Sequence, residues 1–206
     1  MHRRRVWLVA AIFATILTCR GTDPAVAVGS AARLIHLLAL EAGDPVAEIG
    51  AGEGDLTVEI ARALGPASRV YTTELADELD GLRETVAESG LENVVVIEAL
   101  PDSANLSAGC CEAIFMQRVY HHFRRPERNS ATLLRALRPG GRLAILDFEP
   151  KEHWDQPEGT PESRGGHGMP SALLLEELER AGFELIRIER DWPDDLYAVL
   201  VRKPPS

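Results

Sequence analysis

Hydrophobic side chains follow two different spacings along this chain. Residues 25–42 carry them at helical spacing, and Gly43 comes directly afterwards. Glycine readily adopts the left-handed conformation that ends helices, so the pattern predicts a helix capped at Gly43. The apolar positions of this helix are Ala27, Ala31, Leu34, Leu37 and Leu38.

Seven short runs of apolar or β-branched residues come next, and each has the length of a strand. Helix-length segments lie between the first five runs, at 56–64, 75–89 and 126–137, with a shorter stretch after Met116. Strands that alternate with helices build a parallel sheet with helices on both faces, so we expect a doubly wound α/β fold. The predicted strands are residues 46–49, 69–73, 94–98, 113–116, 142–147, 184–190 and 197–202.

The last two predicted strands are joined differently. About six residues separate them, including Trp192 and Pro193, which is too few for a crossover connection. We therefore expect an antiparallel hairpin at one edge of the sheet. One long irregular stretch, residues 150–170, is rich in Gly, Pro, Glu and His, and loops of this kind often cover binding sites.

Composition places these elements in one globular domain. The chain has 206 residues, of which 45% are hydrophobic and 26% are charged. Its 32 acidic and 22 basic residues give a formal net charge of −10. A surface of that sign repels phosphate backbones, so a nucleic-acid partner is disfavoured.

The first 27 residues follow the plan of an export signal. Three arginines, Arg3 to Arg5, precede an uncharged and mostly apolar run of 13 residues from Val6 to Thr18. A helix needs roughly 20 apolar residues to span a bilayer, so this run is short for a permanent anchor. Two cleavage sites compete, because residues 16–19 resemble a bacterial lipoprotein box that ends at Cys19 and residues 25–27 offer an A-x-A site.

We therefore expect residues 1–27 to be an export signal or a membrane anchor, and residues 28–206 to form the single domain. The domain would then lie in the cell envelope, or in the cytoplasm if the signal is not functional. If Cys19 carries a lipid, Cys110 and Cys111 are the remaining thiols. Adjacent cysteines are more typical of buried small residues at the start of a strand than of a metal site or a strained disulfide.

The first motif that indicates chemistry follows the first predicted strand. Gly50, Gly52 and Gly54 alternate through a turn that opens the next helix. Glycines let the backbone approach a ligand closely, and a helix N-terminus offers free N–H groups with a partial positive charge. The spacing G-x-G-x-G differs from the dinucleotide fingerprint G-x-G-x-x-G, whose last glycine is replaced here by Asp55. Glu48, just before the turn, suits a positively charged ligand better than a pyrophosphate.

A second carboxylate stands at the end of the second predicted strand. Glu74 comes twenty residues after Gly54. A carboxylate at that place can accept hydrogen bonds from both hydroxyl groups of a ribose. Each of these features alone is also compatible with an ordinary loop or a solvated strand end, and their combination in this order is what favours a binding site.

In this order the motifs resemble those of the class I S-adenosylmethionine-dependent methyltransferases, over roughly residues 44–202. The run from Glu48 to Gly54 is similar to the family's first motif and Glu74 to its second. Glu98-Ala99, residues 112–115 and the L-x-P-G-G turn at residues 137–143 are similar to three further motifs. Residues 120–123, Tyr-His-His-Phe, suggest the small-molecule branch that includes the ubiquinone/menaquinone C-methyltransferase-like enzymes.

The resemblance implies a Rossmann-like sheet with strand order 3-2-1-4-5-7-6, S-adenosylmethionine as cofactor and a small-molecule methyl acceptor. It implies in-line displacement at the methyl carbon, for which the protein mainly orients the acceptor and excludes water. Glu98-Ala99 is expected near the adenine. The expected cofactor-binding residues are Glu48, Gly50, Gly52, Gly54, Glu74, Glu98, Ala99 and Gln117.

The acceptor pocket is expected beyond the carboxyl ends of the fourth and fifth strands. Neighbouring residues on a helix point about 100° apart, so we expect at most one of His121 and His122 to face the pocket easily. Together with His167 they are the candidate catalytic residues. The three lack a spacing such as H-E-x-x-H, so no metal site is expected. The further candidates are Gln117, Arg118, Tyr120, Asp147 and Glu149.

Two other functions remain open at this point. Because S-adenosylmethionine is made in the cytoplasm, an exported enzyme would lack an obvious supply of it, which favours a non-catalytic binding protein that has kept the fold. An uncleaved anchor that leaves the domain on the cytoplasmic side would resolve this conflict. A dehydrogenase would also place Glu74 on a nicotinamide ribose, but the glycine spacing does not fit one. The retained glycines and Glu74 favour the active methyltransferase. Neither the acceptor atom nor the oligomeric state is indicated by these residues.

Overall fold

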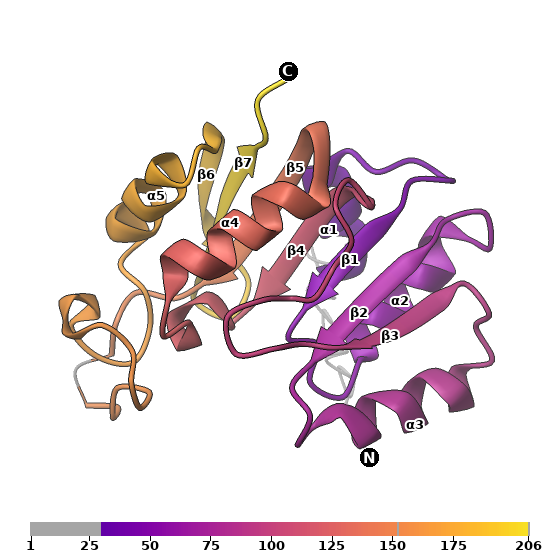
Figure 1. The fold of residues 1–206 in the computed structure, drawn as a ribbon, viewed down its shortest axis with the longest axis horizontal. Coiled ribbons are helices and arrows are strands. Elements are labelled where there is room, and N and C mark those ends of the chain that lie inside the picture. Colours follow the sequence, from indigo (N-terminus) through magenta and orange to yellow (C-terminus); the bar gives the residue numbers. More distant parts are fainter. Residues whose placement is uncertain (1–29, 152, 206) are drawn as a thin grey trace, which may run out of the picture.

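The computed structural model describes residues 30–151 and 153–205 (Figure 1). The predicted export or anchor segment, residues 1–27, lies outside the described residues, as does Cys19. Among the residues that the structure describes, no helix combines the length and the apolar character needed to cross a membrane.

One seven-stranded sheet with the order β3-β2-β1-β4-β5-β7-β6 forms the centre of the molecule. All neighbouring strands are parallel except β7, which runs antiparallel to both β5 and β6. The expected fold class, strand order and edge hairpin are therefore confirmed. The strands are β1 (Val46–Ile49), β2 (Val70–Glu74), β3 (Val94–Glu98), β4 (Cys111–Gln117), β5 (Leu137–Asp147), β6 (Glu184–Trp192) and β7 (Leu196–Arg202).

Helices cover both faces of this sheet, and Figure 1 shows α4 and α5 in front of it with α1 and α2 behind. Alternate residues of β4 face the two layers: Ile114 packs with the α4 and α5 side chains, and Phe115 packs with those of α1 and α2. The helices are α1 (Ser30–Leu38), α2 (Asp55–Leu64), α3 (Leu79–Ser89), α4 (Pro126–Ala136) and α5 (Ser171–Arg180), with single 3₁₀ turns η2 (Tyr120–His122) and η3 (Glu162–Arg164).

The first helix ends earlier than expected. Leu38 is its last residue, and Ala39 adopts the left-handed conformation directly after it, with φ +49°, while Gly43, with φ +102°, lies four residues further on. The backbone N–H of Leu40 then donates to the carbonyl of Ile35, which closes the helix end. The connection to β1 is short, so the chain has to turn directly after Leu38, and Gly43 lies within that connection.

Two further elements differ from the expectation. Helix α5 was not predicted, although Leu174 and Leu178 are buried four residues apart, as a helix requires. Strand β5 begins at Leu137 instead of residue 142, because Leu137 pairs with Cys111 across an irregularity in the β4–β5 register. The L-x-P-G-G turn therefore belongs to the strand itself. Cys111 is the buried first residue of β4, as expected, and both Cys110 and Cys111 are free thiols.

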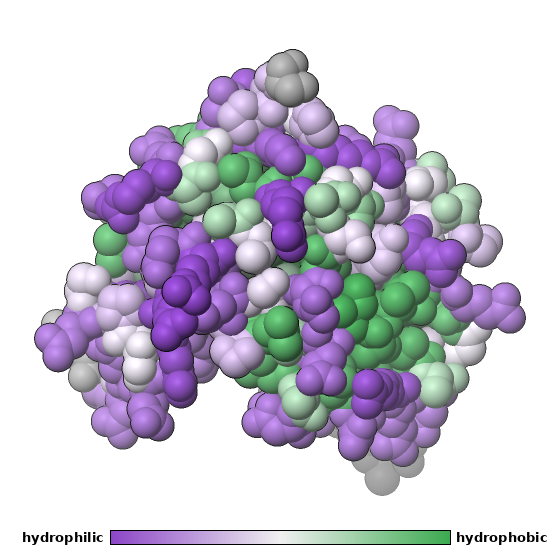
Figure 2. Space-filling model, viewed as in Figure 1, coloured by the Kyte–Doolittle hydropathy of each residue, from purple (hydrophilic) through white to green (hydrophobic). Residues whose placement is uncertain are grey.

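The front of the sheet is incompletely covered at β3. No described helix lies between β3 and β4, and Figure 2 shows hydrophobic residues gathered over this part of the molecule. Strand residues Val95 and Ile97 are partly exposed, and Leu100 after the strand is exposed. The loop that replaces a helix here leads from the end of β3 to β4, and its buried Ala104 and Leu106 pack in the same layer as α4 and α5. Its first residues form one wall of a cavity.

Candidate active site

The glycine turn after β1, residues 50–54, contains three glycines with positive φ: Gly50, Gly52 and Gly54. A Cβ atom on Gly50 would lie 2.6 Å from Cγ2 of Val119, and one on Gly54 would lie 2.5 Å from Cδ1 of Leu82. Gly50 is therefore required by packing as well as by conformation, whereas at Gly54 the end of the Leu82 side chain could shift, and the positive φ is the stronger requirement. A Cβ on Gly52 would meet no described atom within 4 Å. Gly52 thus faces open space at the entrance to α2.

Glu74 holds this turn from the end of β2. Its side chain is buried; Oε2 accepts a hydrogen bond from the backbone N–H of Gly52 and Oε1 accepts one from Leu75, each over 2.8 Å. A carboxylate oxygen has two lone pairs, so both oxygens can accept a further hydrogen bond. The carboxylate is fixed by the protein and still has acceptor capacity for a ligand with two hydroxyl groups.

Glu48 lies beneath the other side of the turn. Its buried carboxylate accepts a hydrogen bond from the hydroxyl of Thr57, which in turn lies 2.8 Å from the hydroxyl of Thr72. Burial raises the pKa of Glu48 to about 8; the Thr57 hydrogen bond opposes this shift and the nearby charge of Glu74 adds to it. A cation bound in front of the turn would favour the ionised form of this carboxyl group.

Two cavities flank the turn. One of about 370 Å³ lies between the turn, Glu74 and the residues after β3, and one of about 410 Å³ includes Glu48 and the start of α2. Both volumes are in the range of small-molecule sites, roughly 300–1,000 Å³. Gly50, Gly52, Gln117 and Arg118 line both cavities.

Nearly all of the expected cofactor-binding residues are brought together here. Ala99 lines the 370 Å³ cavity, but the neighbouring Glu98 side chain is exposed and is not part of either lining. The backbone carbonyl of Glu98 accepts a hydrogen bond from the Asn105 amide. The other expected residues line at least one cavity: Glu48, Gly50, Gly52, Gly54, Glu74 and Gln117.

A third cavity of about 490 Å³ lies beyond the carboxyl ends of β4 and β5. Arg118 lines this cavity as well as the other two, and His122 lines both this cavity and the 370 Å³ cavity. The third cavity therefore adjoins the space around the glycine turn. Its lining residues come from the segment after β4 that includes η2, the loop after β5 and the β6–β7 turn: Arg118, His121, His122, Phe148, Lys151, His153, Trp154, His167, Asp194 and Asp195.

The three candidate catalytic histidines meet in this cavity. His121 is buried, and its Nδ1 lies 2.8 Å from Oδ1 of the buried Asp147. His122 is exposed at the rim, where partial burial and the neighbouring His121 and His167 lower its pKa to about 4. The expectation that at most one of the adjacent pair faces the pocket was wrong. Both line the cavity, and their rings tilt towards each other with centroids 4.2 Å apart.

Other expected acceptor-site residues have structural positions instead. The Tyr120 hydroxyl is buried against that of Ser130, 3.2 Å away. Asp147 lies beneath His121, and the Glu149 carboxylate accepts the backbone N–H of Ser171 at the start of α5. None of these three lines the 490 Å³ cavity.

The residues that sequence reasoning missed come from late in the chain. Asp194 and Asp195 occupy the β6–β7 turn with positive φ, which indicates a turn but no ligand. Only the strand order, which places β7 beside β5, brings them to the cavity. Phe148 and Trp154 carry a weak signal, since Phe148 lies just before the loop already expected to cover a site and Trp154 lies within it.

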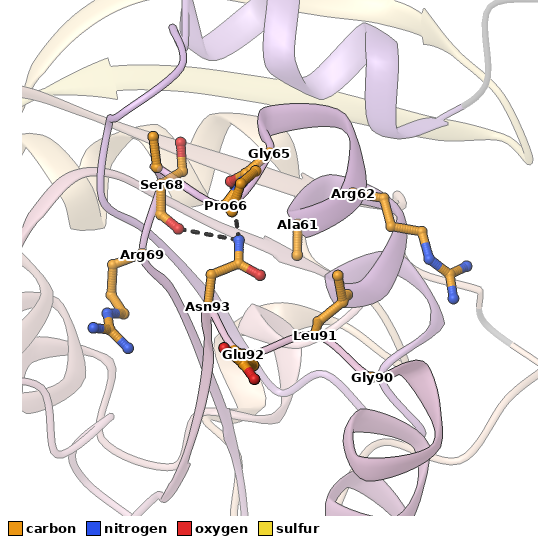
Figure 3. A pocket seen from close by; sticks show the side chains of 11 residues that line it. Ala61, Arg62, Gly65, Pro66, Ser68, Arg69, Gly90, Leu91, Glu92 and Asn93 are labelled. Atoms are coloured by element: carbon orange, nitrogen blue, oxygen red, sulfur yellow. Dashed lines mark hydrogen bonds between the residues drawn. The ribbon is translucent and has the colours of Figure 1, made fainter.

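A larger cavity of about 610 Å³ lies at the amino ends of β2 and β3, at the opposite end of the strands from the glycine turn (Figure 3). There the side-chain amide of Asn93 donates to the carbonyls of Gly65 and Ser68, both over 3.1 Å. These bonds tie the loop after α2 to the start of β3. Ligands of open α/β sheets bind at the carboxyl ends of strands, so we place the active site around the glycine turn instead.

Comparison with known proteins agrees with this placement. A family model described as a methyltransferase domain matches residues 27–188. The chain belongs to the class I S-adenosylmethionine-dependent methyltransferases. The resemblance predicted from the motifs is thereby confirmed, and S-adenosylmethionine is the cofactor of this methyltransferase.

Individual relatives are distant. A ubiquinone/menaquinone biosynthesis C-methyltransferase of Saccharophagus degradans is 29% identical over 116 residues, which are 55% of this chain and 47% of that protein. The chain thus matches about half the length of this curated relative. A methyltransferase from Aquifex aeolicus has a similar fold, with a TM-score of 0.71, 23% identity and coverage of 84% of this chain and 89% of the other.

A phosphoethanolamine N-methyltransferase of Haemonchus contortus, solved in complex with S-adenosyl-L-methionine, also shares the fold. Its TM-score is 0.66 at 16% identity, with coverage of 83% of this chain and 51% of the other. The comparisons support methyl transfer and give no support to a non-catalytic protein or a dehydrogenase.

Proposed function

We propose that this methyltransferase transfers the methyl group of S-adenosylmethionine to a small, ring-containing molecule held in the 490 Å³ cavity. The observation that carries the proposal is the shared lining: Arg118 and His122 belong to both that cavity and the 370 Å³ cavity beside the glycine turn. A donor at the turn and an acceptor in the third cavity would meet across these two side chains.

The residues present fit the cofactor. Gly52 leaves open space where a side chain would otherwise project, and the fixed Glu74 carboxylate retains acceptor capacity for two ribose hydroxyls. Glu48 supplies a carboxyl group on the second side of the turn. When bound, S-adenosylmethionine supplies an electrophilic methyl group on a positively charged sulfur.

The chain's own residues then bind and orient the two reactants. In-line displacement requires the acceptor atom to lie behind the methyl carbon, and orientation of this kind can contribute up to about 7–11 kcal/mol. The pocket of aromatic rings supports a flat acceptor: Phe148 and Trp154 pack edge to face with centroids 5.8 Å apart, and both line the cavity. The relative from S. degradans is named for a C-methylation in quinone biosynthesis, which also favours a ring-containing acceptor.

Calorimetric titration of the full-length protein tests the cofactor site. We expect S-adenosylmethionine and its demethylated product S-adenosylhomocysteine to bind with micromolar affinity, and NAD not to bind. Binding of NAD alone would contradict the proposal and favour a dehydrogenase, whereas binding of none of the three to folded protein would favour a non-catalytic binding protein.

We also propose that residues 1–27 export the protein or anchor it to a membrane, on the strength of Arg3 to Arg5 and the apolar run after them. Fractionation of cells that express the full chain tests this. Recovery in the membrane or periplasmic fraction is expected, and replacing Arg3 to Arg5 by Glu is expected to move the protein to the cytoplasm. Cytoplasmic recovery of the unaltered chain would contradict it.

A further inference from the structure

Three imidazole rings converge in the lining of the 490 Å³ cavity. One ring nitrogen each from His121, His122 and His167 lies within 4.8 Å of the other two. Two of these residues come from η2, directly after β4, and the third comes from the loop after β5. The cluster exists only in the folded chain, which is why no metal-ligand spacing is visible in the sequence.

The buried member of the cluster has one nitrogen bound and one without a partner. Oδ1 of Asp147 lies 2.8 Å from Nδ1 of His121, and a carboxylate oxygen only accepts hydrogen bonds, so Nδ1 carries the proton and donates. Nε2 of His121 then carries a lone pair, and it is buried with no hydrogen-bond partner among the described residues. A buried polar atom without a hydrogen-bond partner is costly, so its presence here indicates that Nε2 of His121 binds a ligand.

The ring of His167 is held in the same way. Its Nδ1 lies 2.9 Å from the backbone carbonyl oxygen of Asp155. A carbonyl oxygen only accepts hydrogen bonds, so Nδ1 is the protonated nitrogen and Nε2 has the free lone pair. A histidine that donates from one nitrogen to a carboxylate or a carbonyl, and offers the other nitrogen, is the usual arrangement around protein-bound metals.

We propose that His121, His122 and His167 bind a divalent transition-metal ion, with Zn²⁺ as the ion that suits three neutral imidazoles. Zn–N bonds of about 2.0–2.1 Å require the three nitrogens to approach one another more closely than 4.8 Å. His122 is exposed and its ring has room to move inward. His167 is partly exposed and would move together with the loop segment at Asp155 that holds its Nδ1, while Asp147 holds His121 in place.

Three protein ligands leave a fourth position, and here that position faces the cavity. An open fourth position distinguishes catalytic zinc sites from structural ones, which have four protein ligands. A bound Zn²⁺ lowers the pKa of a coordinated hydroxyl group. The structure therefore points to a hydroxylated ring as the acceptor class: its hydroxyl oxygen would bind the ion and release its proton to solvent water. This second step rests on the proposed function, whereas the metal site does not.

Metal binding can be measured directly on tag-free, full-length protein stripped of metal with a chelator. Titration with Co²⁺, followed by its visible absorption, and with Zn²⁺ by calorimetry is expected to give one ion per chain. His122→Gln and His167→Gln should each lower the affinity at least about tenfold, as loss of a ligand does. His153→Gln is the matched control, because His153 lines the same cavity outside the cluster and should leave the affinity unchanged.

His121→Gln is a stricter variant, but it alters a buried residue. Its circular dichroism and its affinity for S-adenosylhomocysteine report whether it has folded, and the two rim variants remain informative if it has not. Failure of the unaltered protein to bind either ion, or equal losses in the His153 control and the cluster variants, would overturn the proposal.

The acceptor role has a separate readout. Catechol, used as a hydroxylated-ring probe, should shift the Co²⁺ absorption bands of the loaded protein, and toluene should not. An unchanged spectrum with catechol would overturn the acceptor role. Because metal binding is measured without the methyl donor, an ion bound in a protein that fails to bind S-adenosylmethionine would contradict the proposed function alone, and the reverse result would contradict the metal site alone.

Discussion

The backbone N–H of Gly52 donates to Oε2 of Glu74 over 2.8 Å, which joins the turn after β1 to the end of β2. The second oxygen of the same carboxylate accepts the N–H of Leu75. One side chain thus fixes both the position of the turn and its own orientation before any ligand arrives. A site arranged in advance avoids the entropy cost of ordering it on binding.

Glu74→Ala should weaken the binding of S-adenosylmethionine by roughly 1.5–3 kcal/mol, because a charged acceptor of hydrogen bonds is lost. Calorimetry on the folded variant measures this. Glu78→Ala is the matched control, since Glu78 lines the same cavity but is exposed. An unchanged affinity in the Glu74 variant would remove this residue from the ribose site.

Gly52→Val should abolish cofactor binding, because the added side chain would fill the open space in front of the turn. The left-handed backbone at Gly52 also strains any side chain, at roughly 1–2 kcal/mol. Gly90→Val separates the two effects: Gly90 has φ +67° and open space around it, but lies at the end of α3 away from the site. Both variants should lose similar stability, and only the first should lose the cofactor. Intact binding by Gly52→Val would rule out close approach at this residue.

The sequence predicted the sheet and most of the cofactor site because both depend on local patterns. Strand-length apolar runs alternate with helix-length segments. The glycine turn follows β1 and Glu74 ends β2, so their positions along the chain place them at the carboxyl ends of the strands. The third cavity could not be predicted in this way. Its walls come from η2, the loop after β5 and the β6–β7 turn, and Asp194 and Trp154 join the histidines only through long-range packing.

The stability of the protein should fall as pH rises from about 4.5 to about 8, through Glu48. Its pKa rises from an ordinary value of 4.5 in the unfolded chain to about 8 when buried. Between these values the unfolded chain has lost the proton that the folded protein keeps, so this group contributes a slope of up to about 1.4 kcal/mol per pH unit. Below pH 4.5 its contribution is fully present, and above pH 8 it is lost.

Denaturant unfolding at several pH values checks this effect. Glu48→Gln should flatten the dependence of stability on pH relative to the unaltered protein. Glu59 is exposed and lines the same 410 Å³ cavity as Glu48, so Glu59→Gln should retain the slope. Parallel profiles for the unaltered protein and Glu48→Gln would contradict the raised pKa.

Arg164→Ala should destabilise the protein by about 3–5 kcal/mol. The Arg164 guanidinium is buried; it donates to the carbonyl of Tyr120 over 2.8 Å and lies 3.5 Å from Oε2 of Glu177. Its removal leaves the largely buried Glu177 without a partner. Replacing both residues, as Arg164→Met with Glu177→Leu, should recover much of the loss.

A surface pair provides the comparison for this prediction. Arg180 and Glu176 also form an ion pair, but both side chains are exposed, so Arg180→Ala should cost at most about 1 kcal/mol. Chemical denaturation of the four proteins measures these differences. Equal losses in the Arg164 and Arg180 variants would show that burial of the first pair has no energetic consequence.

Trp154→Ala should raise the KM for the methyl acceptor and leave the affinity for S-adenosylmethionine unchanged. Trp154 packs against Phe148 and His167 in the acceptor cavity and is absent from the two cavities beside the glycine turn. Leu185→Ala, at another exposed hydrophobic residue, is the control and should change neither value. A weakened affinity for S-adenosylmethionine in the Trp154 variant would contradict the separation of the acceptor cavity from the cofactor site.

The backbone conformation of Arg118 lowers stability at a residue that lines the proposed site. Arg118 is a non-glycine residue with φ +59°, a conformation that disfavours any side chain by roughly 1–2 kcal/mol, yet its side chain lines all three cavities around the site. Substitution of Arg118 by glycine would relieve this backbone strain, and selection for thermostability alone would favour the glycine variant. Directed evolution for heat resistance, carried out without an activity screen, should therefore replace Arg118 early. The resulting protein should unfold at a higher temperature but lack the arginine side chain that lines the three cavities.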